Sequence, residues 1–337
     1  MQRQFGRMSR PGGASASGAA GATRVRQPFA FKAGSKFLQP SIVQRQALAK
    51  IEEVMALGAQ ELPVPLENGF FVIPCGSGKT FLMVMAAMLA VREAARKRGG
   101  QARALFLCYE QQAVLQLEAL LKDDTTLCPR DYCVYTGTQK DRENLKACFF
   151  VTTYSMFAGA PPKDAKHREV YDMVRQTEWS LVLCDESHHV GALTYEPLVR
   201  ALMERSLQLF GFTATLYRSY EERSSETRAE HEARVFGWFG SVLFRRTIYD
   251  LEKLGLIAKV RQCVVEVPFV PVFRAAYEQA ASDPSLRMRL QGVHPTKLNA
   301  LVQICDAHRL LGHGGIVFAT HLYAAQVLEK TLDGRVG

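Results

Sequence analysis

The segment that most limits the fold of this chain is residues 74–80, which read Pro-Cys-Gly-Ser-Gly-Lys-Thr. It follows an apolar run and begins a helical stretch, which is the setting of a phosphate-binding loop. Glycines let backbone N–H groups curve around phosphate oxygens, and the helix N-terminus adds its positive end. We therefore expect Lys79 to reach the β- and γ-phosphates of ATP and the Thr80 hydroxyl to bind Mg²⁺. The expected ATP-binding set in this segment is Pro74, Cys75, Gly76, Ser77, Gly78, Lys79 and Thr80.

One departure leaves an alternative open at this loop. Ile73 stands where the common pattern has its first glycine, so a chance glycine-rich turn is the competing interpretation.

The rest of the pattern predicts an α/β protein with a mostly parallel sheet, because short apolar runs alternate with helical stretches. A helix is expected at 79–98, since its cationic end precedes Gly99 and Gly100, as helix C-termini favour. The expected strands lie at 70–74, 104–109, 149–154, 180–184 and 207–212.

The basic charge of the chain is concentrated at its start. The formal net charge is +9, but residues 1–50 hold nine of the 42 Lys and Arg and no acid, which leaves 33 basic against 33 acidic residues. Residues 1–36 are rich in Gly, Ala, Ser and Arg, so we expect a disordered basic tail. An organellar transit peptide is the alternative, because such segments are also Arg-rich and acid-free. The apolar run at 81–91 is too short to span a bilayer, so we expect no membrane partner.

A second chemical signal is the apolar run at 181–184, which ends in Asp185 and Glu186. At the carboxyl end of a strand, Asp185 is expected to hold Mg²⁺, and Glu186 to orient and deprotonate an attacking water. Lys79, Asp185 and Glu186 are therefore the expected catalytic residues. The alternative is an exposed strand end with solvated acids. His188 and His189 do not predict a joint metal site, because adjacent side chains of an extended segment point in opposite directions.

The order of three motifs, Gly-Ser-Gly-Lys-Thr, Asp-Glu-Ser-His at 185–188 and Thr-Ala-Thr at 213–215, resembles motifs I, II and III of superfamily-two helicases. Segments over about 38–332 are further similar to the XPB-type translocases of transcription factor TFIIH. They lie at 73–79, 152–156, 178–179, 256–260, 294–297 and 316–319.

The resemblance implies roles that the residues alone do not. His188, Thr213 and Thr215 would couple the ATP site to nucleic acid, and Gln44 would read adenine. The alternative for Gln44 is a surface residue of the first helix. The implied nucleic-acid contacts are Gln116, Thr136, Gly137, Thr153 and Arg218, each of which is also open to a purely structural interpretation.

The resemblance also implies the domain order. A RecA-like ATP-binding domain is expected at 37–258, followed at 259–337 by a thumb-like stretch and an incomplete second RecA-like domain with its first strand and helix. The arginine fingers of that second domain are not expected within these residues.

The implied activity is ATP-dependent translocation on, or opening of, double-stranded DNA in transcription initiation and excision repair. The implied cofactors are ATP and Mg²⁺, and the implied partners are DNA and TFIIH-like proteins. The implied location is the nucleus, or a mitochondrion or other organelle if the tail is a transit peptide. Two alternatives stay open: a restriction- or repair-type motor, and an ATP- and DNA-binding module without turnover.

Overall fold

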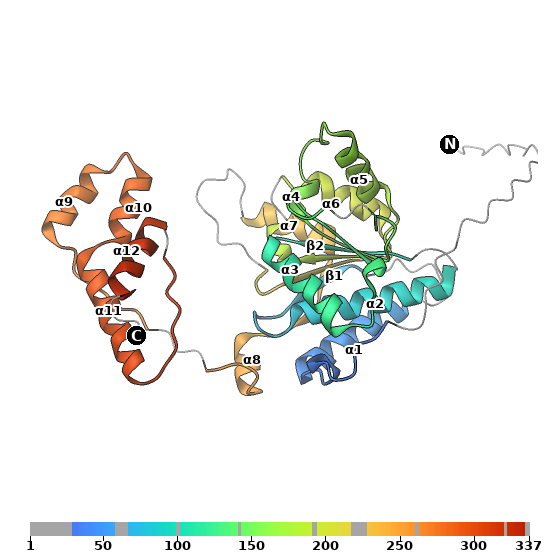
Figure 1. Ribbon diagram of the computed structural model, residues 1–337, viewed down its shortest axis with the longest axis horizontal. Coiled ribbons are helices and arrows are strands. Elements are labelled where there is room, and N and C mark those ends of the chain that lie inside the picture. The colour runs from blue at the N-terminus through green and yellow to red at the C-terminus, as the bar shows by residue number, and fades with distance from the viewer. Residues whose placement is uncertain are drawn as a thin grey trace, which may run out of the picture. The chain divides into compact units, whose positions relative to one another are not determined.

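The computed structural model describes residues 29–57, 67–98, 102–140, 143–190, 194–216, 228–259, 263–319 and 322–333. The chain divides into two compact units, 1–259 and 260–337, and the elements of each are shown in Figure 1. None of the described helices is long and apolar enough to cross a membrane.

The first unit is built on a seven-stranded sheet in the order β3-β4-β2-β5-β6-β1-β7, and every neighbouring pair is parallel. Its strands are β1 (Gly69–Val72), β2 (Ala104–Cys108), β3 (Tyr132–Tyr135), β4 (Phe149–Thr153), β5 (Leu181–Asp185), β6 (Leu209–Thr213) and β7 (Ser241–Arg245). The five expected strands and the α/β class are confirmed. Strands β3 and β7, at the two edges of the sheet, were not expected.

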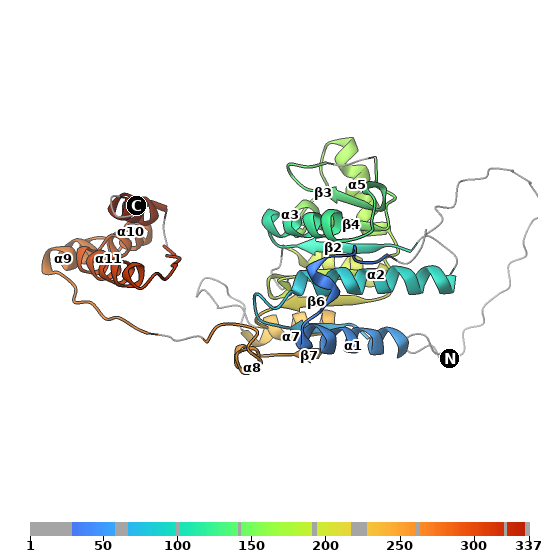
Figure 2. The same ribbon diagram turned by 60° about the horizontal axis from the view of Figure 1, so that its bottom comes forward.

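Helices cover both faces of this sheet, as the two views in Figures 1 and 2 show. The core on one face includes α1 (Ile42–Leu57), α2 (Lys79–Arg98) and α3 (Gln111–Ala119), and the core on the other includes α4 (Tyr154–Phe157), α5 (Ala165–Gln176), α6 (Glu196–Arg205) and α7 (Arg228–Phe239). The expected helix at 79–98 is confirmed at both ends as α2. Parallel strands covered on both faces are buried throughout, which explains their continuous apolar runs.

Short helical turns complete the first unit. They are η1 (Lys36–Leu38), η2 (Leu120–Asp124), η3 (Pro129–Asp131), η4 (Ser187–His189) and α8 (Ile248–Lys253). The η2 turn has π-helical hydrogen bonding, and the other η turns are 3₁₀.

The boundary expected for the disordered tail is wrong, because residues 29–36 pack against the first unit. Phe31 pairs with Thr125 in an isolated antiparallel bridge, and the Ser35 hydroxyl donates to Asp124 Oδ1 at 2.9 Å. The Phe31 ring lies 5.3 Å from Phe81, so this stretch adds aromatic surface to the core. Residues 1–28 of the expected tail lie outside the described residues.

The described part of the second unit is helical. It contains α9 (Pro271–Gln279), α10 (Pro284–Gly292), α11 (Pro295–Leu310) and α12 (Leu322–Asp333). The first strand expected for the second RecA-like domain is not formed among the described residues 263–319 and 322–333, and in the XPB-like segment 316–319 Ile316 and Phe318 are 81% and 90% exposed. An extended segment needs a neighbouring strand for its backbone hydrogen bonds, and the described residues of this unit offer none.

Candidate ATP-binding site

The phosphate-binding loop connects β1 to α2 at the carboxyl edge of the sheet. The Ile73 N–H donates to the Thr213 carbonyl of β6 at 2.9 Å, which fixes the start of the loop. Gly76 and Gly78 have φ of +78° and +86°, values that side chains other than glycine rarely adopt. The Ser77 hydroxyl donates back to the Pro74 carbonyl at 2.5 Å. Because Ile73 is fully buried, its side chain contributes to the core at the place where the common pattern has a glycine.

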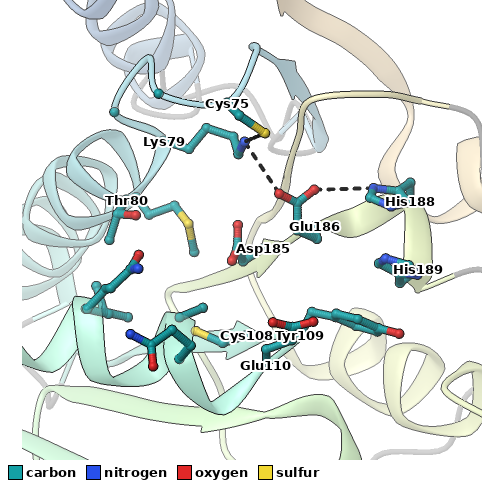
Figure 3. A pocket seen from close by; sticks show the side chains of 17 residues that line it. Cys75, Lys79, Thr80, Cys108, Tyr109, Glu110, Asp185, Glu186, His188 and His189 are labelled. Carbon is teal, nitrogen blue, oxygen red and sulfur yellow. Dashed lines mark hydrogen bonds and ion pairs between the residues drawn. The ribbon is translucent and has the colours of Figure 1, made fainter. Parts of the chain in front are cut away.

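The loop forms one wall of a pocket of about 580 Å³, shown in Figure 3. The opposite wall comes from the end of β5 and the turn after it, and a third wall comes from the end of β2 and the start of α3. The pocket brings together four of the expected residues, namely Lys79, Thr80, Asp185 and Glu186. Sequence reasoning predicted their proximity, and the geometry agrees with it.

The Lys79 ammonium makes one contact across the pocket, to Glu186, and one within its own loop, to Cys75. Lys79 Nζ lies 3.5 Å from Glu186 Oε1 and 3.9 Å from Cys75 Sγ. The Lys79 side chain is only 10% exposed, so its charge is held close to the acids and partly shielded from water. In this arrangement the lysine is paired with the carboxylate that the sequence assigns as the general base.

The Asp185 carboxyl lies deeper in the pocket than Glu186. Burial, and after it the nearby Glu186 carboxylate, raise the pKa of Asp185 to about 6, while Lys79 opposes the shift. A carboxylate that is costly to keep ionised without a cation is well suited to hold one. The Asp185 carbonyl accepts a hydrogen bond from the Tyr154 hydroxyl at 2.9 Å, which ties the end of β5 to the start of α4.

The turn after β5 is strained at Glu186. Its φ and ψ of 44° and 48° are left-handed, and among the described residues no other non-glycine residue has a positive φ. Such strain persists only where surrounding contacts hold it, and it is concentrated at functional sites. The backbone bonds from His189 N to Glu186 O (2.9 Å) and from Val190 N to Ser187 O (3.1 Å) close this turn.

His188 links the acids to the third motif. Its Nδ1 lies 3.4 Å from Glu186 Oε2 and 2.8 Å from Thr213 Oγ1. Thr213 Oγ1 in turn donates to the Thr215 carbonyl at 2.6 Å. A continuous polar chain therefore runs from the nucleotide pocket to the end of β6, through the three residues that the resemblance assigned to coupling.

A contact that the sequence did not predict lies on the far wall of the pocket. The Tyr109 ring stacks on the His189 ring, with centroids 3.8 Å apart and planes 8° from parallel. Tyr109 is the last residue of the expected strand 104–109, so its place at the carboxyl edge was foreseeable. Its partner was not, because the order of strands in the sheet cannot be read from local patterns.

Gln44 is engaged with the phosphate-binding loop. Its Nε2 donates to the Ser77 carbonyl at 3.2 Å, and its Oε1 accepts from the Ser41 N–H at 2.7 Å. The side chain therefore lies at the loop but uses both ends of its amide within the protein. Its assignment as the adenine-reading residue stays a prediction.

The expected nucleic-acid contacts are dispersed. Gln116 lines the nucleotide pocket, whereas Thr136 and Thr153 are buried and Gly137 is exposed. Thr136 Oγ1 accepts from Gln111 Nε2 at 3.2 Å, so its hydroxyl is used inside the protein. Arg218 lies outside the described residues. These roles stay predictions. Of the neighbouring residues Thr136 and Gly137, the exposed Gly137 is better placed to contact nucleic acid.

The donor groups fit a magnesium nucleotide. The pocket combines a loop with two left-handed glycines, an ammonium, a hydroxyl at a helix N-terminus and a buried carboxylate. Hydroxyl and carboxylate oxygens are ligands that Mg²⁺ accepts, and Thr80 and Asp185 would hold it. No cluster of three or more His, Cys, Asp or Glu able to bind a metal occurs among the described residues.

The chain is similar in sequence to known proteins. The XPB/SSL2 helicase/translocase subunit of the general transcription and DNA repair factor IIH from Saccharomyces cerevisiae is 26% identical, over 77% of this chain and 28% of its own length. The XPB subunit from Encephalitozoon cuniculi is 27% identical, over 79% of this chain and 36% of its own length. The chain thus spans about a third of the length of these relatives. The helicase domain of Hef from Pyrococcus furiosus is 17% identical, covering 88% of this chain and 54% of its own, with a TM-score of 0.47.

A family model described as "Type III restriction enzyme, res subunit" matches residues 37–218. This match includes the phosphate-binding loop, both acids and the third motif. Because it covers more than half of the chain, this protein belongs to that family, and its resemblance to superfamily-two helicases of the XPB type is confirmed.

Proposed function

We propose that this chain carries the ATP-binding part of an ATP-dependent motor of the XPB type, which translocates on or opens double-stranded DNA. The observation that carries the proposal is one pocket in which Lys79, Asp185 and Glu186 converge beside a phosphate-binding loop. A plain phosphate-binding protein has no use for the second acid, because only hydrolysis needs a group that takes a proton from water.

The pocket assigns a task to each of its polar groups. The loop N–H groups and Lys79 bind the β- and γ-phosphates, and Thr80 and Asp185 hold Mg²⁺. When bound, the ion supplies positive charge beside the phosphate oxygens. In the absence of phosphate, Lys79 is paired with Glu186 at 3.5 Å. Phosphate oxygens would compete for the same ammonium, so nucleotide binding releases Glu186 to orient and deprotonate the attacking water.

The coupling of this chemistry to DNA runs through His188. Its Nδ1 contacts both Glu186 and Thr213. A movement of the Glu186 carboxylate would therefore alter the contact of His188 with Thr213 at the end of β6. The resemblance to superfamily-two motors, in which the Thr-Ala-Thr segment links the ATP site to nucleic acid, supports Thr213 and Thr215 as the coupling residues of this chain.

The biological setting follows from the relatives alone. Their names identify them as subunits of transcription and DNA repair factor IIH. We propose double-stranded DNA and TFIIH-like proteins as partners and the nucleus as the location. Organellar import of the basic tail is the competing proposal for location, and a fluorescent fusion of residues 1–28 distinguishes the two.

The decisive experiment separates binding from turnover. Lys79→Ala should abolish or severely weaken fluorescent-ATP binding, because it removes the point charge facing the phosphates. Lys97→Ala, at the exposed opposite end of α2, is the matched control. In a complete form of the motor, Glu186→Gln should bind Mg-ATP almost normally and lose hydrolysis, with Glu52→Gln, exposed on α1, as its control. Equal affinity of the Lys79→Ala and wild-type chains would refute the assignment of the loop.

A module without turnover is the second candidate, and one observation favours it. Among the described residues, no arginine lines the nucleotide pocket. Arginine contacts to the transferring phosphate raise rates by about 10³ to 10⁵ in related reactions. Phosphate release that stays at background with duplex DNA, in a full-length protein that binds Mg-ATP, would favour this candidate. The family description also keeps a restriction-type motor open, which shares the same pocket chemistry.

A further inference from the structure

The wall of the pocket opposite the phosphate-binding loop is formed by a run of three rings. Tyr109 stacks on His189 at 3.8 Å, and the His188 and His189 rings lie 4.0 Å apart at 41°. Figure 3 shows Tyr109 beneath the turn that carries Glu186 and both histidines. The stack therefore joins two strands, β2 and β5, at the edge where the chemistry takes place.

The turn needs an external support. Glu186 is left-handed, and within the turn two backbone hydrogen bonds from His189 and Val190 and the contact of its carboxylate with His188 hold this conformation. A non-glycine residue in this conformation is strained and relaxes unless neighbouring contacts oppose it. The near-parallel stack of Tyr109 on His189 acts on the last residue of the turn, so it opposes that relaxation directly.

The orientation of Glu186 depends on the same turn. One carboxylate oxygen lies 3.5 Å from Lys79 Nζ and the other lies 3.4 Å from His188 Nδ1. If the turn relaxed, both interactions would break together, because His188 and Glu186 are carried by the same few residues. Half-ångström errors in the position of a catalytic group are enough to cost rate.

We propose that Tyr109 is a positioning residue for Glu186: its ring, stacked on His189, holds the left-handed turn that aims the Glu186 carboxylate into the nucleotide pocket. This inference rests on the proposed ATPase function for its effect on rate. Its structural half, support of the turn by the stack, does not depend on that function.

Hydrogen exchange tests the structural half without any turnover. The amides of His189 and Val190 report opening of the turn, because they donate to Glu186 and Ser187. Stacked aromatic pairs are worth about 0.5–1.5 kcal/mol, so Tyr109→Leu should speed exchange of these two amides roughly 2- to 12-fold. Tyr109→Phe keeps the ring and should restore the wild-type rate. Tyr249→Leu removes a tyrosine that is 74% exposed on α8 and is the matched control.

Single-turnover hydrolysis tests the catalytic half with the same variants. Tyr109→Leu should slow the chemical step and leave the affinity for Mg-ATP nearly unchanged, and Tyr109→Phe should restore the rate. A general loss of packing would instead weaken binding and rate together. If Tyr109→Leu unfolds the first unit, His189→Leu removes the other ring and carries the same two measurements.

The outcomes separate this inference from the proposed function. Unchanged exchange of both amides in Tyr109→Leu overturns the inference, and so does equal acceleration in Tyr109→Phe, which would assign the effect to the hydroxyl. A wild-type chain that neither binds nor hydrolyses ATP refutes the proposed function, while the exchange data still decide whether the stack holds the turn.

Discussion

Replacing Asp185 by Asn should stabilise the nucleotide-free protein at pH 8 while it weakens Mg²⁺-dependent ATP binding. The pKa of Asp185 is raised from 3.8 to about 6, chiefly by burial. The folded state therefore binds this proton more tightly than the unfolded state does. The resulting stabilisation is fully present below about pH 4 and is lost as the pH rises through 6.

The magnitude follows from the size of the shift. A difference of about two pKa units corresponds to about 3 kcal/mol of cost for the ionised carboxylate above pH 6. Asp185 is not fully buried, and solvent screens part of this cost, so we expect a gain of about 1–2 kcal/mol at pH 8. Near pH 4 the gain should be much smaller, because the carboxyl is then almost fully protonated in the folded state and close to its midpoint of protonation in the unfolded state.

Urea unfolding followed by tryptophan fluorescence measures the free energy of unfolding of the first unit, which contains Asp185. The chain has two tryptophans, Trp179 and Trp238, and both are buried in the first unit. Measurements with EDTA at pH 4 and pH 8 give the pH dependence. A free energy of unfolding that falls in Asp185→Asn, or that changes equally at both pH values, would refute the reasoning.

Asp250 provides a control, because its contribution to the free energy of unfolding should depend on pH in the opposite direction. Hydrogen bonds from the Thr247 N–H, at 2.7 Å, and from its hydroxyl lower the pKa of Asp250. Its contribution to stability is therefore present at pH 8 and is lost as the pH falls through the folded-state pKa. Asp250→Asn should destabilise the protein at pH 8 and have a smaller effect in acid, the reverse of Asp185→Asn.

Three further outcomes are expected. Thr213→Val should reduce DNA stimulation of hydrolysis in a competent motor without changing Mg-ATP affinity, because it removes the hydroxyl that contacts His188 at 2.8 Å. Titration of the hydrolysis rate with duplex DNA measures this effect. Deleting residues 2–28, which carry five arginines, should flatten the dependence of log K for DNA on log salt, by about 0.9 for each phosphate that the tail no longer neutralises. Steady-state phosphate release by the chain alone should stay well below about one per second even with DNA, because no described arginine faces the pocket.

The five inner strands of the sheet could be predicted from the sequence, whereas its two edge strands could not. Strands such as β2 and β4 are fully buried, and a continuous apolar run is the expected pattern for that environment. Edge strand β7 has exposed ends and only partly buried residues between them, so its local pattern resembles that of a loop. Strand β3 is four residues long and includes two tyrosines, which is too short a signal to separate from its surroundings.

The tail boundary failed for a related reason. Composition averaged over residues 1–36 is polar and glycine-rich, yet Phe29 and Phe31 near its end find aromatic partners far along the chain. Phe29 lies 5.1 Å from Phe149, and Phe31 lies 5.3 Å from Phe81. Two large aromatic side chains can hold a short segment that no local average would identify.

The convergence of the expected catalytic groups could be predicted because each motif lies at the end of a parallel strand. Lys79 follows β1 and the two acids end β5, and in a parallel sheet all such ends lie at one edge. The support of those groups could not be predicted, because it depends on which strands are neighbours. Residues Leu107 and Cys184 are register partners, and this pairing brings Tyr109 beneath His189. Without the order of strands, the sequence indicates only that Tyr109 lies at the end of a strand, and not which residue it contacts.

The pocket is arranged so that nucleotide must displace contacts that the protein makes with itself. Lys79 is paired with Glu186, and Gln44 donates to the Ser77 carbonyl of the phosphate-binding loop. Phosphate competes for the first contact, and adenine, if Gln44 reads it, competes for the second. Each exchange replaces one polar contact by another, so its net free energy is small compared with the gross interaction. If Lys79 binds phosphate and Gln44 binds adenine, Glu186 would be freed for chemistry and the Gln44 side chain would leave the Ser77 carbonyl. Binding energy is thereby converted into a rearrangement of the site.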